Sequence, residues 1–290
     1  MKSTIKKIID GNIEFYSIFG GAPASFLLTR IFYFSFFVVY LFSDLTRFEL
    51  IQKDMLSFPY SQIYSYFGGT FVFPIYLLMM VSALFVIFRP ELYWPRFLVF
   101  VTALYLFYLR ISFNCLYHFE NILIINLFLF CFVDNRKNSI ARNNSVLYFG
   151  MHFGLISMYF FAALSKIRIS GLSFISDQVP IEALILNEYW KYGHTDFWSQ
   201  NLNYLNSLNL LNSFGWLVSS IVLVAEIISV LFFFSSRLKK FIIINIFVLQ
   251  LGFILFLNLN GFWSILISYT LFIPIFFKKR FFDSQNVKTI

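Results

Sequence analysis

The sequence predicts an all-α protein, a polytopic bundle of about eight transmembrane helices in which residues 1–290 form a single domain. Hydrophobic residues make up 59% of the chain and charged residues only 12%, roughly half the charged share of an ordinary soluble domain. Phenylalanine alone occurs 43 times. A soluble fold of this size cannot bury so much apolar surface, because much of any soluble protein's surface must be wetted.

The first half of the chain contains four stretches that approach the length of about 20 apolar residues that a bilayer core requires of a helix. They are residues 24–43, 70–88, 97–114 and 118–133. The third and fourth stretches are nearly continuous, so they require a tight turn near Tyr117 and His118. The connection at 44–69 combines aromatic and polar residues and is expected to carry interfacial helices.

The second half of the chain adds four more apolar stretches. They are residues 147–165, 213–234, 241–257 and 262–277. The last two flank the sequence "NLNG", from Asn258 to Gly261, which is typical of a turn. The outer loop 166–212 again contains aromatic and polar residues, and it too is expected to carry interfacial helices.

The basic residues predict the orientation of these spans. With the N-terminus inside, most of the 22 lysines and arginines fall in cytoplasmic segments and few in outer ones, as the positive-inside rule requires. An even number of spans then places both termini in the cytoplasm of a multi-pass protein of the cell membrane. The net charge of +8 is explained by topology, so the lipid bilayer is an expected partner and nucleic acid is not.

Charged residues within a span cost roughly 2.5–3.5 kcal/mol each, so each needs a partner or a function. Arg30 lies about 9 Å above the inner end of the first span and Glu226 about 12 Å above the inner end of the sixth. The similar depths predict a structural ion pair between Arg30 and Glu226. The alternative is that Glu226 belongs to a proton path.

The third span and the turn after it carry a polar stripe. Arg110, Asn114 and His118 are spaced four residues apart, so they share one face of a helix that rises toward the outer surface. The stripe is either a hydrogen-bond ladder facing the bundle or the lining of a cavity that opens outward. In the second case Arg110 and Asn114 are candidate cofactor-binding residues.

Lys166 follows the apolar run of the fifth span, with Arg168 two residues later. A lysine at the end of a span commonly extends its ammonium into water along its aliphatic stem. However, the outer face is the side that the positive-inside rule disfavours for lysine. In a partly apolar pocket, desolvation would favour a neutral amine that can act as a base. Both interpretations of Lys166 remain open from the residues alone.

The remaining polar residues give weaker indications. His152 is expected to be a packed or interfacial histidine, and Cys115 and Cys131 are expected to be buried free thiols. His194 lies in the outer loop, but its spacing to His118 matches no recognised metal-binding pattern, so no metal is expected. Gly-rich phosphate loops and the usual hydrolase motifs do not occur in the sequence.

Four segments resemble, in their order along the chain, the HTTM superfamily, the membrane domain shared with vitamin K-dependent gamma-carboxylase. They are "LLTRIFYFS" (27–35), "YHFENILIINLFLFCFVDNR" (117–136), "MYFFAALSKI" (158–167) and "WLVSSIVLVAEIISVLFF" (216–233). The resemblance covers roughly residues 24–277. In length the chain is most similar to the short members of the sporulation-delaying-protein B type, which are needed to mature an exported peptide toxin.

The resemblance implies a catalytic role for two residues. The lysine that ends the similar stretch of the carboxylase deprotonates vitamin K hydroquinone, which implies that Lys166 is the base. The family histidine thought to steady the oxyanion corresponds to His118. The implied cofactor is a reduced quinone, such as vitamin K hydroquinone or menaquinol. A histidine common in the seventh span of the family is replaced here by Gln250.

Two functions of different classes follow. The first is a gamma-carboxylase-like membrane enzyme that uses a quinol and the Lys166 base at the outer face to modify or mature an exported peptide. The alternative is a non-enzymatic export, immunity or maturation partner that binds a secreted peptide with its outer aromatic loops. A transporter is the weakest option, because the sequence shows no internal repeat and no paired helix interruptions.

Overall fold

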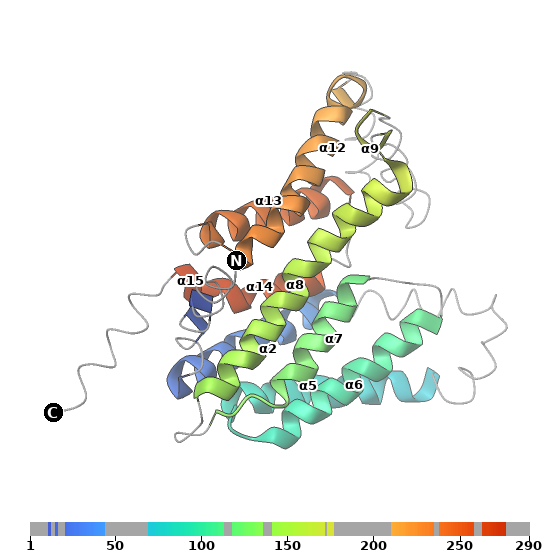
Figure 1. Ribbon diagram of the computed structural model, residues 1–290. Helices are drawn as coiled ribbons and strands as arrows, with labels where there is room; N and C mark the ends of the chain where they lie inside the picture. The colour runs from blue at the N-terminus through green and yellow to red at the C-terminus, as the bar shows by residue number, and fades with distance from the viewer. Residues whose placement is uncertain are drawn as a thin grey trace. The chain divides into compact units, whose positions relative to one another are not determined.

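The computed structural model describes residues 11–12, 15–16, 21–43, 69–112, 118–135, 141–171, 173–176, 210–234, 238–257 and 263–276. Every regular element in these ranges is a helix, which confirms the predicted all-α fold class (Figure 1). The chain divides into two compact units, Met1–Gly154 with Trp263–Ile290, and Leu155–Phe262. We call these the first and the second unit. The predicted single-domain organisation stays a prediction.

Each predicted apolar stretch corresponds to a helix or a helical run. The first unit contains α2 (Ala22–Ser43), α5 (Gly69–Phe88), α6 (Tyr93–Ser112), α7 (His118–Phe130) and the run α14 (Trp263–Tyr269), η4 (Thr270–Phe272) and α15 (Ile273–Phe276). The second unit contains α9 (Ser173–Ser176), α12 (Leu210–Ile228), η2 (Ser229–Phe233) and α13 (Lys239–Leu257). Helix α8 (Ala141–Ser170) contributes its first half to the first unit and its second half to the second.

Aromatic side chains form much of the core of the first unit. The ring of Phe130 on α7 lies 4.4 Å from that of Phe32 and 5.8 Å from that of Tyr33, both on α2. One turn earlier on α7, the Asn126 amide donates a 2.9 Å hydrogen bond to the Ser268 hydroxyl of α14. Large rings and one buried polar bond therefore join three helices that are far apart in the sequence.

A buried polar cluster joins α2, the turn after α7 and the start of α8. The Ser25 hydroxyl donates to the side-chain oxygen of Asn135 at 2.7 Å, and the Asn135 amide donates to Thr29 at 3.0 Å. Asn144 donates to the Ser25 hydroxyl at 3.4 Å, and Tyr148 lies 3.3 Å from the same oxygen. Because these bonds satisfy one another, the cluster holds three chain segments in one register.

Helix α8 is longer than the predicted stretch 147–165 and contains 30 residues. It continues past Lys166 to Ser170, so Lys166 lies inside the helix and not beyond its end. The predicted stretch 213–234 is also altered, because α12 tightens into the 3₁₀ helix η2 at Ser229. The Ser229 hydroxyl donates to the carbonyl of Glu226, three residues earlier, at 2.6 Å, a side-chain bond that distorts regular α-helix.

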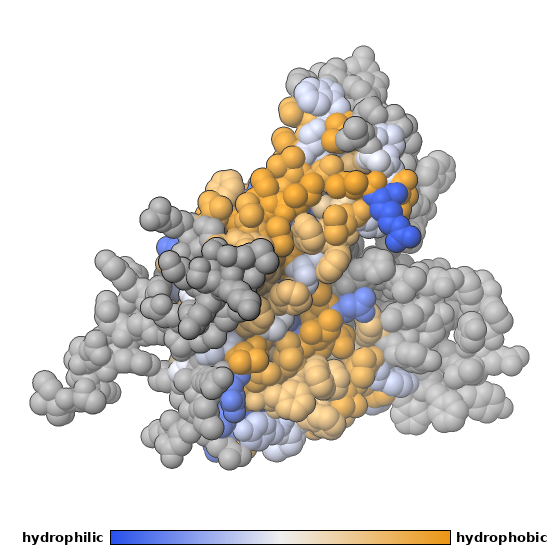
Figure 2. Space-filling view, viewed as in Figure 1, coloured by the Kyte–Doolittle hydropathy of each residue, from blue (hydrophilic) through white to orange (hydrophobic). Residues whose placement is uncertain are grey.

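In the part of the chain that the structure describes, three helical stretches are long and apolar enough to cross a membrane, namely Ala24–Leu41, Asn143–Ser170 and Trp216–Phe233. Shorter apolar stretches lie at Val72–Phe88, Tyr93–Phe107, Asn121–Phe130 and Leu266–Phe276. Figure 2 shows hydrophobic residues over most of the described surface in view, and large apolar side chains such as Phe73, Phe161 and Phe241 are more than half exposed. This surface fits an apolar solvent. The number of crossings and the cytoplasmic termini stay predictions.

Candidate functional site

The second unit contains a buried ion pair between two of its helices. The Lys166 ammonium on α8 contacts the Glu226 carboxylate Oε1 on α12 directly. The Glu226 side chain is only 3% exposed, whereas that of Lys166 is 27% exposed. The Lys166 side chain therefore points toward a buried carboxylate. We predicted either an ammonium that extends into water or a neutral amine in an apolar pocket, and neither description fully fits this contact.

Apolar side chains surround the pair. Phe174 of α9 places its ring centroid 5.6 Å from the Lys166 Nζ, a distance at which a cation is attracted to the ring face. Phe174 also packs with Ala163 and Leu223, the residues one turn before Lys166 on α8 and one turn before Glu226 on α12. Because these neighbours are apolar, the charge on each member of the pair depends strongly on the other.

The backbone conformation of Gly171 allows Phe174 to lie beside Lys166. Its φ of 58° lies in the left-handed region that glycine adopts without cost, and its N–H donates to the Ile167 carbonyl at 2.9 Å. This bond closes the last turn of α8. The chain then reverses, and α9 lies against α12. A glycine thus ends the helix just beyond Lys166 and returns an aromatic ring to the ammonium.

Further buried polar atoms lie on α12 and α13. Among the described residues of the second unit, the buried oxygens Ser219 Oγ, Glu226 Oε2 and Gln250 Oε1 have no hydrogen-bond partner. Ser219 and Glu226 are seven residues apart on α12, so they share a face about two turns in length. Buried polar atoms are nearly always bonded in folded proteins, so these oxygens remain available to accept a hydrogen bond.

Gln250 is fully buried on α13. Its amide donates to the Tyr159 hydroxyl of α8. Tyr159 and Lys166 are seven residues apart and share one face of α8. Gln250 is thus joined to the helix that carries Lys166, about two turns away from that lysine.

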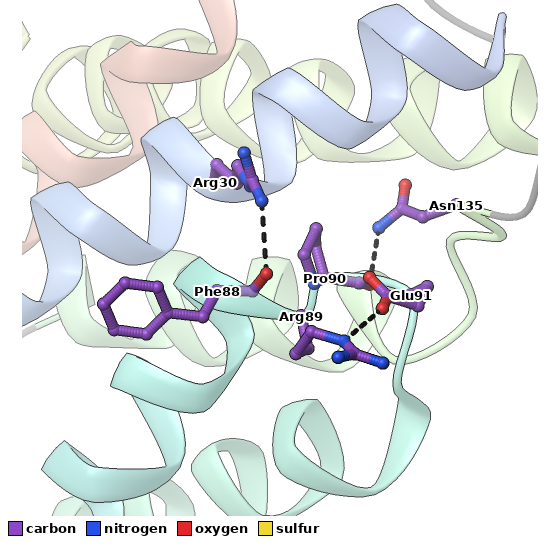
Figure 3. Close-up of polar contacts among 6 residues, drawn as sticks. All are labelled: Arg30, Phe88, Arg89, Pro90, Glu91 and Asn135. Atoms are coloured by element: carbon purple, nitrogen blue, oxygen red, sulfur yellow. Dashed lines mark hydrogen bonds and ion pairs between the residues drawn. The ribbon is translucent and has the colours of Figure 1, made fainter.

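Arg30 and Glu226, the predicted structural ion pair, each have another partner within their own unit. The Arg30 guanidinium donates to the Phe88 carbonyl at the end of α5 at 3.1 Å (Figure 3) and lies 4.4 Å from the ring centroid of Phe26. The Glu226 carboxylate contacts the Lys166 ammonium. An Arg30–Glu226 contact would join the two units and stays a prediction.

Two side-chain contacts lie at the turn between α5 and α6. The Asn135 amide of the polar cluster donates to the Pro90 carbonyl at 2.9 Å (Figure 3). Arg89 and Glu91 form an exposed ion pair of 2.7 Å across the turn. Such exposed pairs contribute little to stability, so we assign this contact no part in the site.

The remaining predicted site residues fall largely outside the described part of the chain. Arg110 lies near the end of α6 and His118 is the first residue of α7, but their side chains are outside the described residues. Asn114 lies outside them entirely. Whether the polar stripe lines a cavity, and whether His118 lies near Lys166, therefore stay predictions.

His152 is a packed histidine, as predicted. Its ring is fully buried, stacks on Phe272 with centroids 4.6 Å apart, and contacts the Tyr16 hydroxyl and the Leu271 carbonyl at 3.1 Å each. Because a carbonyl only accepts, Nε2 carries the proton and Nδ1 accepts from Tyr16. His152 thus joins the N-terminal segment to η4. Cys131 is a free thiol that is partly exposed, where full burial was expected.

Within the described ranges, no group of three or more histidine, cysteine, aspartate or glutamate side chains is placed to hold a metal ion. No family model matches the chain, and neither the curated proteins nor the solved structures include a significant match. The candidate site therefore stands on its own geometry, and its best-defined part is the Lys166–Glu226 pair.

Proposed function

We propose that the chain is an integral membrane enzyme of the gamma-carboxylase-like class, in which the Lys166–Glu226 pair removes a proton from a quinol during the maturation of an exported peptide. The observation that carries this proposal is the buried ion pair in apolar surroundings. When an acid and a base are in direct contact and shielded from water, a proton passes between them more readily than when both groups are fully solvated.

A quinol suits the groups that are present. The Glu226 Oε2 oxygen is buried and unpartnered, and it can accept a hydrogen bond from a hydroxyl. Apolar side chains exposed on both helices, among them Leu164 and Val224, are compatible with a ligand that arrives from the lipid. When bound, the reduced quinone supplies, together with oxygen, the stronger base that the family uses on its peptide.

The chain's own residues have defined tasks in this proposal. Lys166 and Glu226 hold and move the proton, and Phe174 covers the ammonium and helps to exclude water. His118, on the expectation from the resemblance, offers a hydrogen bond to the oxygen that has lost its proton. Arg110 and Asn114 orient His118 or contact the ring of the ligand.

The test of this proposal is Lys166→Ala, expressed in the membrane at the level of the unchanged protein. We expect the oxidation of added menaquinol-4 by the purified protein to fall by about 100-fold or more, as for loss of a general acid–base group. Arg168→Ala removes an exposed cation two residues away and serves as the matched control. Organic extraction of the purified protein should also release a quinone.

The non-enzymatic alternative makes the opposite prediction. A peptide-binding partner would mature or export its peptide equally well with Lys166→Ala and would carry no quinone. Unchanged peptide maturation in the Lys166→Ala strain, together with a quinone-free extract, would reject the enzymatic proposal.

A further inference from the structure

The two oxygens of the Glu226 carboxylate have different surroundings. Oε1 receives a hydrogen bond from the Lys166 ammonium, whereas Oε2 is buried without a partner. The nearby Ser229 hydroxyl donates to the Glu226 backbone carbonyl and does not serve the carboxylate. Since the whole residue is only 2% exposed, water has little access to Oε2 from outside. One oxygen of a buried carboxylate is therefore free to accept a proton.

Lys166 is less well suited to accept that proton. An ammonium group has three N–H donors and no acceptor, so Lys166 cannot take a proton while it is charged. It would first have to pass its own proton to Glu226. When the pair is ionised, Glu226 is therefore the only member of the pair with a lone pair ready for use.

We infer that Glu226, through Oε2, is the group that receives the proton, and that Lys166 remains charged and acts as the counter-ion. This inference rests on the proposed function, and it reverses the roles that the resemblance implies for the pair. The O–H bond of the ligand breaks, a new O–H bond forms on Oε2, and no electrons are transferred. The Lys166 charge then offsets the negative charge that is left on the ligand.

The charge balance supports this assignment. Before the transfer the site contains one cation, one anion and a neutral ligand. Afterwards it contains the same cation, a neutral carboxylic acid and an anionic ligand oxygen, so the net charge stays at zero. An apolar site strongly disfavours a net charge, and no counter-ion has to enter or leave during this step.

The same geometry selects the redox form of the ligand. An ionised carboxylate oxygen only accepts hydrogen bonds, so its partner must be a donor. A quinol offers hydroxyl donors at its ring, whereas an oxidised quinone offers only carbonyl acceptors there. Binding should therefore favour the reduced form, because the oxidised form would leave two acceptors facing each other in a buried site.

Infrared difference spectroscopy on the purified full-length protein tests the assignment without turnover. The probe is deoxygenated menaquinol-4, added to the unchanged protein and to Glu226→Gln, Lys166→Arg and Arg168→Gln. We expect the quinol bands to be accompanied by loss of a carboxylate band and gain of a protonated carboxyl band. Both changes should be absent in Glu226→Gln and present in Arg168→Gln, the matched control.

The outcomes separate the inference from the proposed function. Quinol bands without any carboxyl change would overturn the assignment to Glu226 and leave quinol binding in place. A carboxyl change that persists in Lys166→Arg supports direct transfer to Glu226, because arginine cannot relay a proton, and its loss in that variant would overturn the inference. Absence of bound quinol in the unchanged protein would reject the proposed function together with the inference. A carboxyl change that persists in Glu226→Gln would also overturn the inference, because another acid would then be titrating.

Arginine at position 166 provides the second measurement. An arginine side chain stays charged and cannot act as a base, but it can maintain the ion pair. We expect Lys166→Arg to keep menaquinol-4 oxidation within about tenfold of the unchanged protein, and Glu226→Gln to lose about 100-fold or more. Equal loss in Lys166→Arg and Lys166→Met would overturn the inference.

Chemical rescue covers the case in which Lys166→Arg fails to fold. Formate should restore menaquinol-4 oxidation to Glu226→Ala, because it replaces the missing carboxylate in the space that the truncation leaves. Rescue of Lys166→Ala by methylamine, growing with the basicity of the added amine, would instead identify the lysine as the base.

Discussion

Individual charged side chains of this chain are buried in three different ways. Arg96 is fully buried and donates to backbone carbonyls, whereas Glu226 is buried against a cation. Lys239, at the start of α13, is 2% exposed and lies 5.1 Å from the ring centroid of Phe232. In each case a different interaction offsets the free-energy cost of removing the charge from water. The stability of the protein should therefore depend on pH and on substitution differently at each of the three residues.

Lys239 leads to a prediction about pH. Burial lowers the pKa of Lys239 from 10.5 to about 8, and the residue precedes the predicted span 241–257. Between these pH values Lys239 is largely deprotonated in the folded chain and largely protonated in the unfolded chain. Its contribution to the free energy of unfolding therefore rises with pH from about 8 to 10.5. Lys239→Met should remove that rise.

The measurement is the melting temperature in detergent at a series of pH values for the unchanged protein and for Lys239→Met. Lys240→Met, which changes the exposed neighbouring lysine, controls for the titration of surface groups. The prediction would be contradicted if the melting temperatures of the unchanged protein and of Lys239→Met changed in the same way with pH above pH 8.

At the scale of elements, the end of α7 depends on a side chain from α6. Arg96 donates to the carbonyls of Phe130 and Val133 at 2.8 and 2.5 Å, at and just after the end of α7, and the Phe130 carbonyl also accepts from the Val133 N–H at 3.3 Å. Arg96→Met should lower the free energy of unfolding by about 1–3 kcal/mol, because it leaves the buried Val133 carbonyl without this donor. Arg89→Met, at an exposed site, should change it by less than about 0.5 kcal/mol. Thermal unfolding in detergent measures both, and equal effects would reject the capping role.

The pairing of α8 with α12 gives a second prediction at this scale. Lys166→Met or Glu226→Leu alone leaves an uncompensated buried charge and should cost about 3–5 kcal/mol of stability. The double substitution removes both charges and should be nearly neutral or stabilising, since apolar pairs often replace buried ion pairs without loss. A double-mutant cycle of unfolding free energies tests this, and simple additivity of the two single effects would contradict it.

Much of the element order was predictable from the sequence, because helix-length apolar runs are a local property. The stretches 24–43 and 70–88, for example, differ by two residues or fewer at each end from α2 and α5. The partner of Glu226 was not predictable in the same way. A fifth span that ends at 165 places Lys166 at the outer surface and Glu226 about 20 Å below it, so the predicted depths give no sign of this contact.

The structure places Lys166 within α8 because the charged residues after the apolar run do not end the helix. Only Gly171, five residues further on, does so. Partners 60 residues apart in the sequence depend on the exact ends and packing of two helices, and no local pattern contains this information. Gly171 itself was the available signal, since glycine commonly follows the last turn of a helix.

At the scale of the whole molecule, the proposed topology places the turn between α5 and α6 in the cytoplasm and the end of α8 outside. In a background with Cys115 and Cys131 changed to serine, Arg168→Cys should react with a membrane-impermeant maleimide in intact cells. Glu91→Cys should react only after the membrane is permeabilised. Labelling of both positions from the same side would overturn the proposed topology.

The left-handed backbone at Gly171 makes the site sensitive to a very small change. Apart from Gly171 and its two chain neighbours, no described heavy atom lies within 4 Å of where a Cβ would stand, so the cost of Gly171→Ala is that of its backbone angle, about 1–2 kcal/mol. The lower-energy alternative for an alanine is to extend the helix, which would carry the Phe174 ring away from the ammonium. We therefore expect Gly171→Ala to reduce the rate of quinol oxidation clearly while it changes the melting temperature only slightly.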